Sequence, residues 1–114
     1  MEWLQLNDEA QLKEIIEESK KEPVLIFKHS TRCSISAMVK SRLESTWKAQ
    51  ETDVKPYYLD LLSYRPISQK IQELFHVIHE SPQALLISNG TCVYHASHIA
   101  INFPDIKNQA TVKS

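Results

Sequence analysis

Residues 23–36 read Pro-Val-Leu-Ile-Phe-Lys-His-Ser-Thr-Arg-Cys-Ser-Ile-Ser, and the rest of the chain can be placed around them. The apolar run Val24–Phe27 is typical of a strand that is buried on both faces. Polar residues follow, and from Ile35 onward apolar residues recur with helical spacing. The residues expected on one face of this helix are Ile35, Met38, Val39, Leu43 and Trp47. Cys33 therefore lies where a buried strand gives way to a helix.

The position of Cys33 predicts a reactive thiol. The first N–H groups of a helix have no partner within the helix, and the helix dipole is positive there, so a thiolate is stabilised. Arg32 adds a positive charge next in sequence. Ser36 follows three residues after Cys33, so the motif is C-x-x-S, with one thiol where the redox motif C-x-x-C has two. The alternative is a structural role for Cys33, because free cysteines are among the most buried residue types.

Length, charge and cysteine content narrow the class of protein. The 114 residues suit one domain, 1–114, and the net charge of −1 argues against a nucleic-acid or membrane-surface partner. No run approaches the length of a membrane span, and the N-terminus has no signal-peptide pattern, so we expect a cytoplasmic protein. We expect no metal site, because Cys33 and Cys92 are far apart and the five histidines lack ligand spacing.

The order of predicted elements is α-β-α-β-α-β-β-α, which makes an α/β fold with a central mixed four-stranded sheet flanked by helices. The first two strands are joined through a helix and should be parallel, whereas Asn89-Gly90 between two apolar runs predicts a hairpin. The predicted helices run from Asn7-Asp8 to Lys20-Lys21, from Ser34 to Gln50, onward from Pro66, and onward from Pro104; the predicted strands are Val24–Lys28, Tyr57–Asp60, Ala84–Ile87 and Thr91–His95.

This order, with Cys33 after the first core strand, resembles the thioredoxin fold. In that fold a cis proline precedes the third core strand and lies beside the nucleophilic cysteine. Pro82 has the corresponding position here, and the resemblance implies that the Ser81–Pro82 bond is cis. It also implies that the backbone of Ser81 pairs with a substrate segment as an added strand would. The alternative for this segment is a turn that only starts a strand.

A closer resemblance covers residues 4–107. The segments Phe27–Ala37, with Thr31, Cys33, Ile35 and Ser36 in the pattern T-x-C-x-I-S, together with His79–Ala84 and His95–His98, are similar to the monothiol bacilliredoxin family. The resemblance implies a cytosolic enzyme that removes bacillithiol from S-bacillithiolated proteins in low-GC Gram-positive bacteria. Bacillithiol would be the small-thiol co-substrate, and no cofactor would be bound. Ser34 departs from the family pattern, where we expect proline in many members.

The candidate site comprises Cys33 as the attacking thiol and a set of thiol-binding residues, Thr31, Arg32, Ser34, Ser36, Ser81 and Pro82. Arg32 is either a partner for the thiolate or for substrate carboxylates, or a solvated loop arginine. The hydroxyls of Ser34 and Ser36 either bond the sulfur or cap the helix. His29 is a candidate base or cation partner, and the other histidines are expected at the surface or at helix ends.

Cys92 is expected to pack in the fourth strand rather than to resolve a disulfide. Two other functions remain open: a monothiol enzyme of the glutaredoxin kind acting on other small-thiol mixed disulfides, or a non-catalytic thioredoxin-like module that binds peptides. Glutaredoxins of that kind often carry C-G-F-S, whereas this chain has Cys33-Ser34-Ile35-Ser36. We expect S-thiolated proteins as partners and a monomer.

Overall fold

The computed structural model describes residues 1–112, so residues 113 and 114 of the predicted domain lie outside the described residues. The strands are β1 (Leu4–Gln5), β2 (Val24–His29), β3 (Lys55–Asp60), β4 (Gln83–Ser88) and β5 (Thr91–Ser97). The helices are α1 (Gln11–Glu18), α2 (Ser34–Thr46), α3 (Arg65–Phe75) and α4 (Phe103–Val112), with short 3-10 turns η1 (Ala49–Glu51) and η2 (His98–Ala100). None of the helices in this part of the chain is long and apolar enough to cross a membrane.

The strands form one mixed sheet in the order β1-β3-β2-β4-β5. β2 is central: it pairs in parallel with β3 and antiparallel with β4, and β4 continues into β5 as a hairpin. The parallel pair and the hairpin were both predicted from the sequence. The sheet has five strands rather than the predicted four, because Leu4 and Gln5 pair in parallel with Tyr57 and Tyr58. Two residues are too few to show a strand period, so no sequence pattern marked β1.

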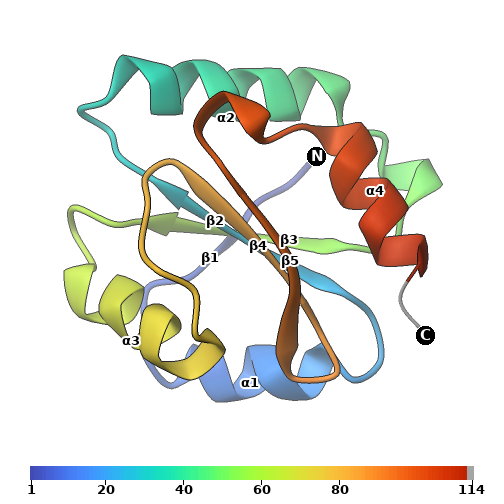
Figure 1. The fold of residues 1–114 in the computed structure, drawn as a ribbon, viewed down its shortest axis with the longest axis horizontal. Coiled ribbons are helices and arrows are strands. Elements are labelled where there is room, and N and C mark those ends of the chain that lie inside the picture. Colours follow the sequence, from blue (N-terminus) through green and yellow to red (C-terminus); the bar gives the residue numbers. More distant parts are fainter. Residues whose placement is uncertain (113–114) are drawn as a thin grey trace.

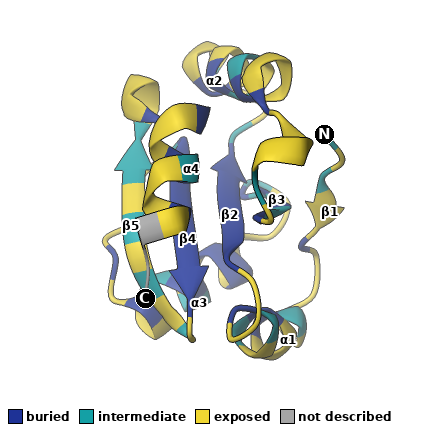
Figure 2. Cartoon of the chain, turned by 90° about the vertical axis from the view of Figure 1, so that its right-hand side faces the viewer, coloured by how far each residue is buried: buried dark blue, intermediate teal, exposed yellow. Residues whose placement is uncertain are grey.

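Helices cover both faces of the sheet (Figure 1), with α1 and α3 on one side and α2 and α4 on the other. Successive side chains of β2 point to opposite faces, so Val24 and Ile26 enter the core under α1 and α3, while Leu25 and Phe27 enter the core under α2 and α4. Figure 2 shows β2 and β4 buried along their length between these layers. The last two residues of β2, Lys28 and His29, therefore point to opposite faces.

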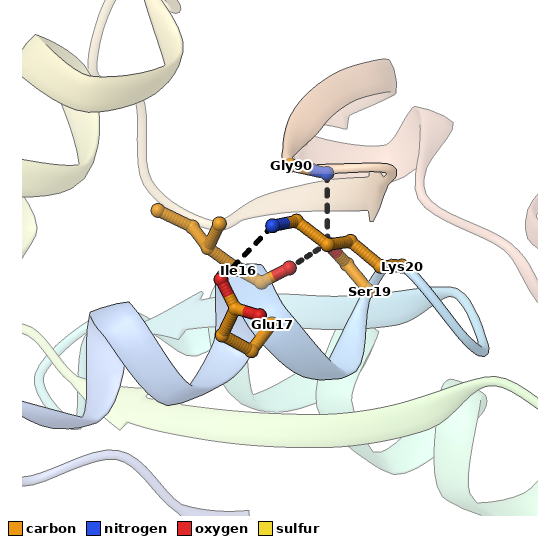
Figure 3. Close-up of polar contacts among 5 residues, drawn as sticks. All are labelled: Ile16, Glu17, Ser19, Lys20 and Gly90. Atoms are coloured by element: carbon orange, nitrogen blue, oxygen red, sulfur yellow. Dashed lines mark hydrogen bonds and ion pairs between the residues drawn. The ribbon is translucent and has the colours of Figure 1, made fainter.

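The hairpin turn is fixed by the only glycine of the chain and by a contact with α1. Asn89 and Gly90 both have positive φ, 52° and 79°, which a glycine adopts without the clash that a Cβ causes. Ser19, at the end of α1, accepts hydrogen bonds from both turn amides: its carbonyl from Asn89 at 2.8 Å and its hydroxyl from Gly90 at 2.9 Å. Figure 3 shows the Ser19 hydroxyl between Gly90 and the Ile16 carbonyl. The contact anchors the hairpin to α1.

The C-terminal ends of α1 and α2 come earlier in the chain than the sequence predicted. α1 stops at Glu18 rather than near Lys21, and α2 stops at Thr46, with a 3-10 turn replacing the predicted helix up to Gln50. The predicted apolar face of α2 was partly wrong: Val39, Leu43 and Trp47 are buried, but Ile35 and Met38 are about half exposed. These two residues lie in the first two turns of α2.

Candidate active site

Cys33 is the N-cap residue of α2, directly after the turn that follows β2. Its backbone N–H donates to the Ser30 carbonyl at 3.2 Å, which closes the turn. The backbone then adopts φ −111° and ψ 120°, the extended geometry that an N-cap requires. The Ser36 N–H donates to Cys33 Sγ at 3.5 Å. Cys33 is partly exposed, and its sulfur lies where free helix amides and the positive end of the helix dipole favour a thiolate.

Ser36 supports this turn from inside the protein. Its side chain is fully buried, and Oγ lies 2.7 Å from His29 Nδ1 while accepting the Ser30 N–H at 3.1 Å. The hydroxyl is therefore committed to β2 and the turn, and the group that contacts the sulfur is the Ser36 backbone amide. Of the two roles considered for Ser36, the structure favours support of the helix start over a hydroxyl bond to sulfur.

His29 completes a three-residue network with Ser30 and Ser36. Burial lowers its pKa below the usual value, and Lys40 lowers it further, while Asp60 and Glu44 act in the opposite direction. A neutral ring accepts the Ser36 hydroxyl proton at Nδ1, which leaves Oγ free to accept from Ser30. The ring also packs 6.0 Å from Phe27 and 5.6 Å from Tyr58, centroid to centroid. This geometry makes His29 a positioning residue for the turn that carries Cys33.

Thr31, Arg32 and Ser34 are exposed around Cys33. The Arg32 backbone N–H is 3.4 Å from Ser30 Oγ, and within residues 1–112 no ion pair involves the Arg32 guanidinium. The Ser34 side chain belongs to the first helical residue rather than to the cap, which is Cys33 itself. These three side chains are placed where a substrate could reach them, and none is used by the fold as a core contact.

Pro82 is buried and its bond to Ser81 is cis, as the resemblance implied. The register pairs Lys28 with Gln83, so Pro82 falls at the end of the sheet where β2 leads into the Cys33 turn. The Pro82 carbonyl accepts the His98 N–H at 2.9 Å, and the Ser81 hydroxyl is buried without a hydrogen-bond partner. The Cys33 turn and the Ser81–Pro82 segment are far apart in sequence, and they thus lie at the same end of the β2/β4 strand pair.

Cys92 lies at the opposite end of the sheet. It pairs with Ile87, which pairs with Val24 at the start of β2, whereas Cys33 follows the other end. Five strand steps separate Val24 from His29, or about 17 Å at about 3.3 Å per residue. Cys92 packs against the core under α1 and α3, and burial raises the pKa of its thiol. The expectation that Cys92 packs is supported by this contact.

The sequence did not predict one polar cluster, which lies on the other face of the sheet and comprises Lys28, Ser68 and His79. Lys28 is fully buried, and its Nζ lies 3.2 Å from His79 Nδ1 and 3.4 Å from the Ser68 carbonyl. Ser68 Oγ is also 3.3 Å from His79 Nδ1. Within the described residues, no group of three or more histidine, cysteine, aspartate and glutamate side chains could hold a metal ion. The sequence signal for the cluster was a lysine directly after the apolar run Val24–Phe27.

Comparison with known proteins shows the family of this chain. The family model described as monothiol bacilliredoxin BrxC matches residues 4–106. The chain belongs to the monothiol bacilliredoxin family. A solved structure described as an oxidoreductase candidate with a thioredoxin fold is 32% identical, with a TM-score of 0.80, over 93% of this chain and 91% of that one.

Two more distant structures show the fold alone. The thioredoxin of Malassezia sympodialis is 18% identical, with a TM-score of 0.75, over 97% of this chain and 92% of its own. The thioredoxin of Fasciola hepatica is 18% identical, with a TM-score of 0.72, over 94% and 95%. The bacilliredoxin chain is thus a thiol oxidoreductase of the thioredoxin fold, with one cysteine in the turn between β2 and α2.

Replacing Ser36 by alanine should destabilise this bacilliredoxin more than any other single hydroxyl loss in the active-site turn. The change leaves the Ser30 N–H and His29 Nδ1 without their buried partner, which costs about 1–3 kcal/mol. Urea unfolding monitored by circular dichroism gives the free energy of unfolding. Ser34→Ala is the matched control, because Ser34 is exposed in the same helical turn and its loss should stay within about 0.5 kcal/mol. Equal effects of the two variants would contradict the network.

Proposed function

We propose that this protein removes bacillithiol from S-bacillithiolated cytosolic proteins by a one-thiol mechanism through Cys33. The observation that carries the proposal is the Cys33 turn itself. The partly exposed Cys33 caps α2, and Ser36 occupies the position at which a second thiol would resolve a disulfide. Cys92 lies at the other end of the sheet. Membership of the bacilliredoxin family supports the choice of bacillithiol as the small thiol.

The chemistry is two successive thiol–disulfide exchanges. In the first, the Cys33 thiolate attacks the bacillithiol sulfur of the mixed disulfide; the Cys33–bacillithiol bond forms as the protein–bacillithiol bond breaks, and the protein leaves as a thiolate that takes up a proton. In the second, a thiolate of free bacillithiol attacks the bacillithiol sulfur held on Cys33, which releases bacillithiol disulfide and restores the Cys33 thiolate. Each step conserves one disulfide bond and needs no bound cofactor.

Other residues of the site would hold the substrate. The backbone of Ser81, next to cis-Pro82, would pair with the extended segment around the modified cysteine, and Thr31, Arg32 and Ser34 would contact the small thiol at the surface. The Ser30–Ser36–His29 network would keep the sulfur at the helix start through both steps.

The test compares two small thiols on one substrate protein. The same single-cysteine protein is prepared as its bacillithiol and as its glutathione mixed disulfide, and release of the free protein is followed by intact mass after adding the bacilliredoxin. We expect faster release from the bacillithiol disulfide, with the small thiol retained on Cys33. Faster release from the glutathione disulfide would favour a glutaredoxin-like enzyme. Release from neither, with the protein still bound, would favour a peptide-binding module.

A further inference from the structure

A second polar site lies on the face of the sheet opposite to α2, beneath α3. A pocket of about 340 Å³ is lined by Leu61, Arg65, Ser68, Gln69, Gln72 and His79. Four of these six residues come from one face of α3 and none of the six is acidic. Lys28 lies directly behind this lining: its side chain is fully buried, and its Nζ contacts two lining residues, Ser68 and His79.

The charge on Lys28 has no internal counterion. The fully buried ammonium meets a carbonyl and an imidazole nitrogen, and none of the five ion pairs among the described residues includes it. A buried cation without an anionic partner is costly. Burial lowers the pKa of Lys28 to about 8, so most molecules still carry the proton at neutral pH. The buried Lys28 ammonium is therefore a positive charge that forms no ion pair with an acidic side chain of the described residues.

The pocket lining adds a second positive charge, that of Arg65, and several neutral hydrogen-bond donors. Arg65 begins α3. Burial lowers the pKa of His79, and the charges of Lys28 and Arg65 lower it further. The neutral His79 ring accepts from Lys28 at Nδ1, so Nε2 carries the proton and remains a donor. Glu80, the acid that acts on His79 in the opposite direction, lies 3.5 Å from His98. The Gln69 and Gln72 amides add neutral donors, and Leu61 adds an apolar wall.

We propose that this pocket binds a small organic carboxylate, with Arg65 and Lys28 supplying the charge and His79 and the two glutamines supplying further hydrogen bonds. A carboxylate bound against Ser68 and His79 brings negative charge close to Lys28, whose ammonium has no counterion among the described residues. The apolar wall and the volume suit a short carbon skeleton rather than a bare inorganic ion. His79 lies three residues before Pro82, so the ligand sits beside the segment that carries the candidate docking site.

This inference goes beyond the proposed function and is tested apart from it, because binding is read in the Cys33→Ala protein, where no thiol exchange occurs at that site. Succinate is titrated into ¹⁵N-labelled protein, with succinamide as the uncharged analogue and inorganic phosphate as the second anion. We expect saturable shifts of the Ser68, Gln69 and His79 amides with succinate only. Shifts elsewhere, equal binding of succinamide, or tighter binding of phosphate would each overturn the carboxylate site.

Three variants locate the binding groups. Arg65→Gln and Lys28→Met should each weaken succinate binding roughly tenfold or more, because the first removes a charged hydrogen-bond partner and the second removes the positive charge behind Ser68 and His79. Lys13→Met is the matched control: Lys13 is exposed on α1, so the same charge is lost away from the pocket and the affinity should stay unchanged. Because Arg65 is exposed, its variant tests the site independently of any effect that Lys28→Met has on the core. Unchanged affinity in Arg65→Gln would refute the proposal.

Discussion

The Cys33→Ala protein should transfer no small thiol, whereas Cys92→Ala should transfer it at the wild-type rate. Cys33 is the partly exposed cysteine at the start of α2, and Cys92 is packed about 17 Å along the sheet from the end of β2. After one turnover with a mixed-disulfide substrate and no free small thiol, intact mass should show one adduct on wild type and on Cys92→Ala. Peptide mapping should place that adduct on Cys33.

The outcome that would contradict a one-thiol mechanism is specific. A Cys33–Cys92 disulfide in the wild-type protein, with the small-thiol adduct trapped only in Cys92→Ala, would show that Cys92 resolves the intermediate. That disulfide would require the two sulfur atoms to approach bonding distance, and therefore a large rearrangement of the sheet. A circular dichroism spectrum of Cys33→Ala that matches wild type is the control for folding.

Lys28→Met should stabilise the protein at pH 7 by about 3 kcal/mol. A pKa lowered from 10.5 to about 8 means that the folded state resists protonation of Lys28, at about 1.4 kcal/mol per pH unit. This penalty is fully present below pH 8, shrinks as the pH rises, and is gone above the unfolded value of 10.5. Methionine fills a similar volume without the charge, and Ser68 Oγ still reaches His79 Nδ1.

The measurement is the free energy of unfolding in urea for both proteins at pH 7 and at pH 10. The advantage of Lys28→Met should be largest at pH 7 and small at pH 10, because the wild type has by then lost most of the penalty. Taking the difference between the two proteins removes the contributions of tyrosine and other lysine groups that titrate in both. A difference that does not change with pH would show that the Lys28 charge is not the cause.

The central strand, the Cys33 turn and the hairpin could be predicted from the sequence because each depends on neighbouring residues. An apolar run followed by helical spacing places Cys33 at a helix start, and Asn89-Gly90 supplies the two positive φ angles of a tight turn. Pro66 and Pro104 also lie in the first turns of helices as predicted. Local geometry alone sets these features.

Features that depend on distant partners were decided by the tertiary structure. β1 exists because Leu4 and Gln5 meet Tyr57 and Tyr58, and the two residues carry no strand signal of their own. The Ser36 hydroxyl turns inward because His29, seven residues earlier, points to the same face of the sheet. The surroundings of Lys28 are set by Ser68 and His79, which lie 40 and 51 residues away. The order of residues determined that Cys33 lies where a strand gives way to a helix. Only packing across the sheet determined which side chains support the Cys33 turn, and that the buried Lys28 charge has no counterion among the described residues.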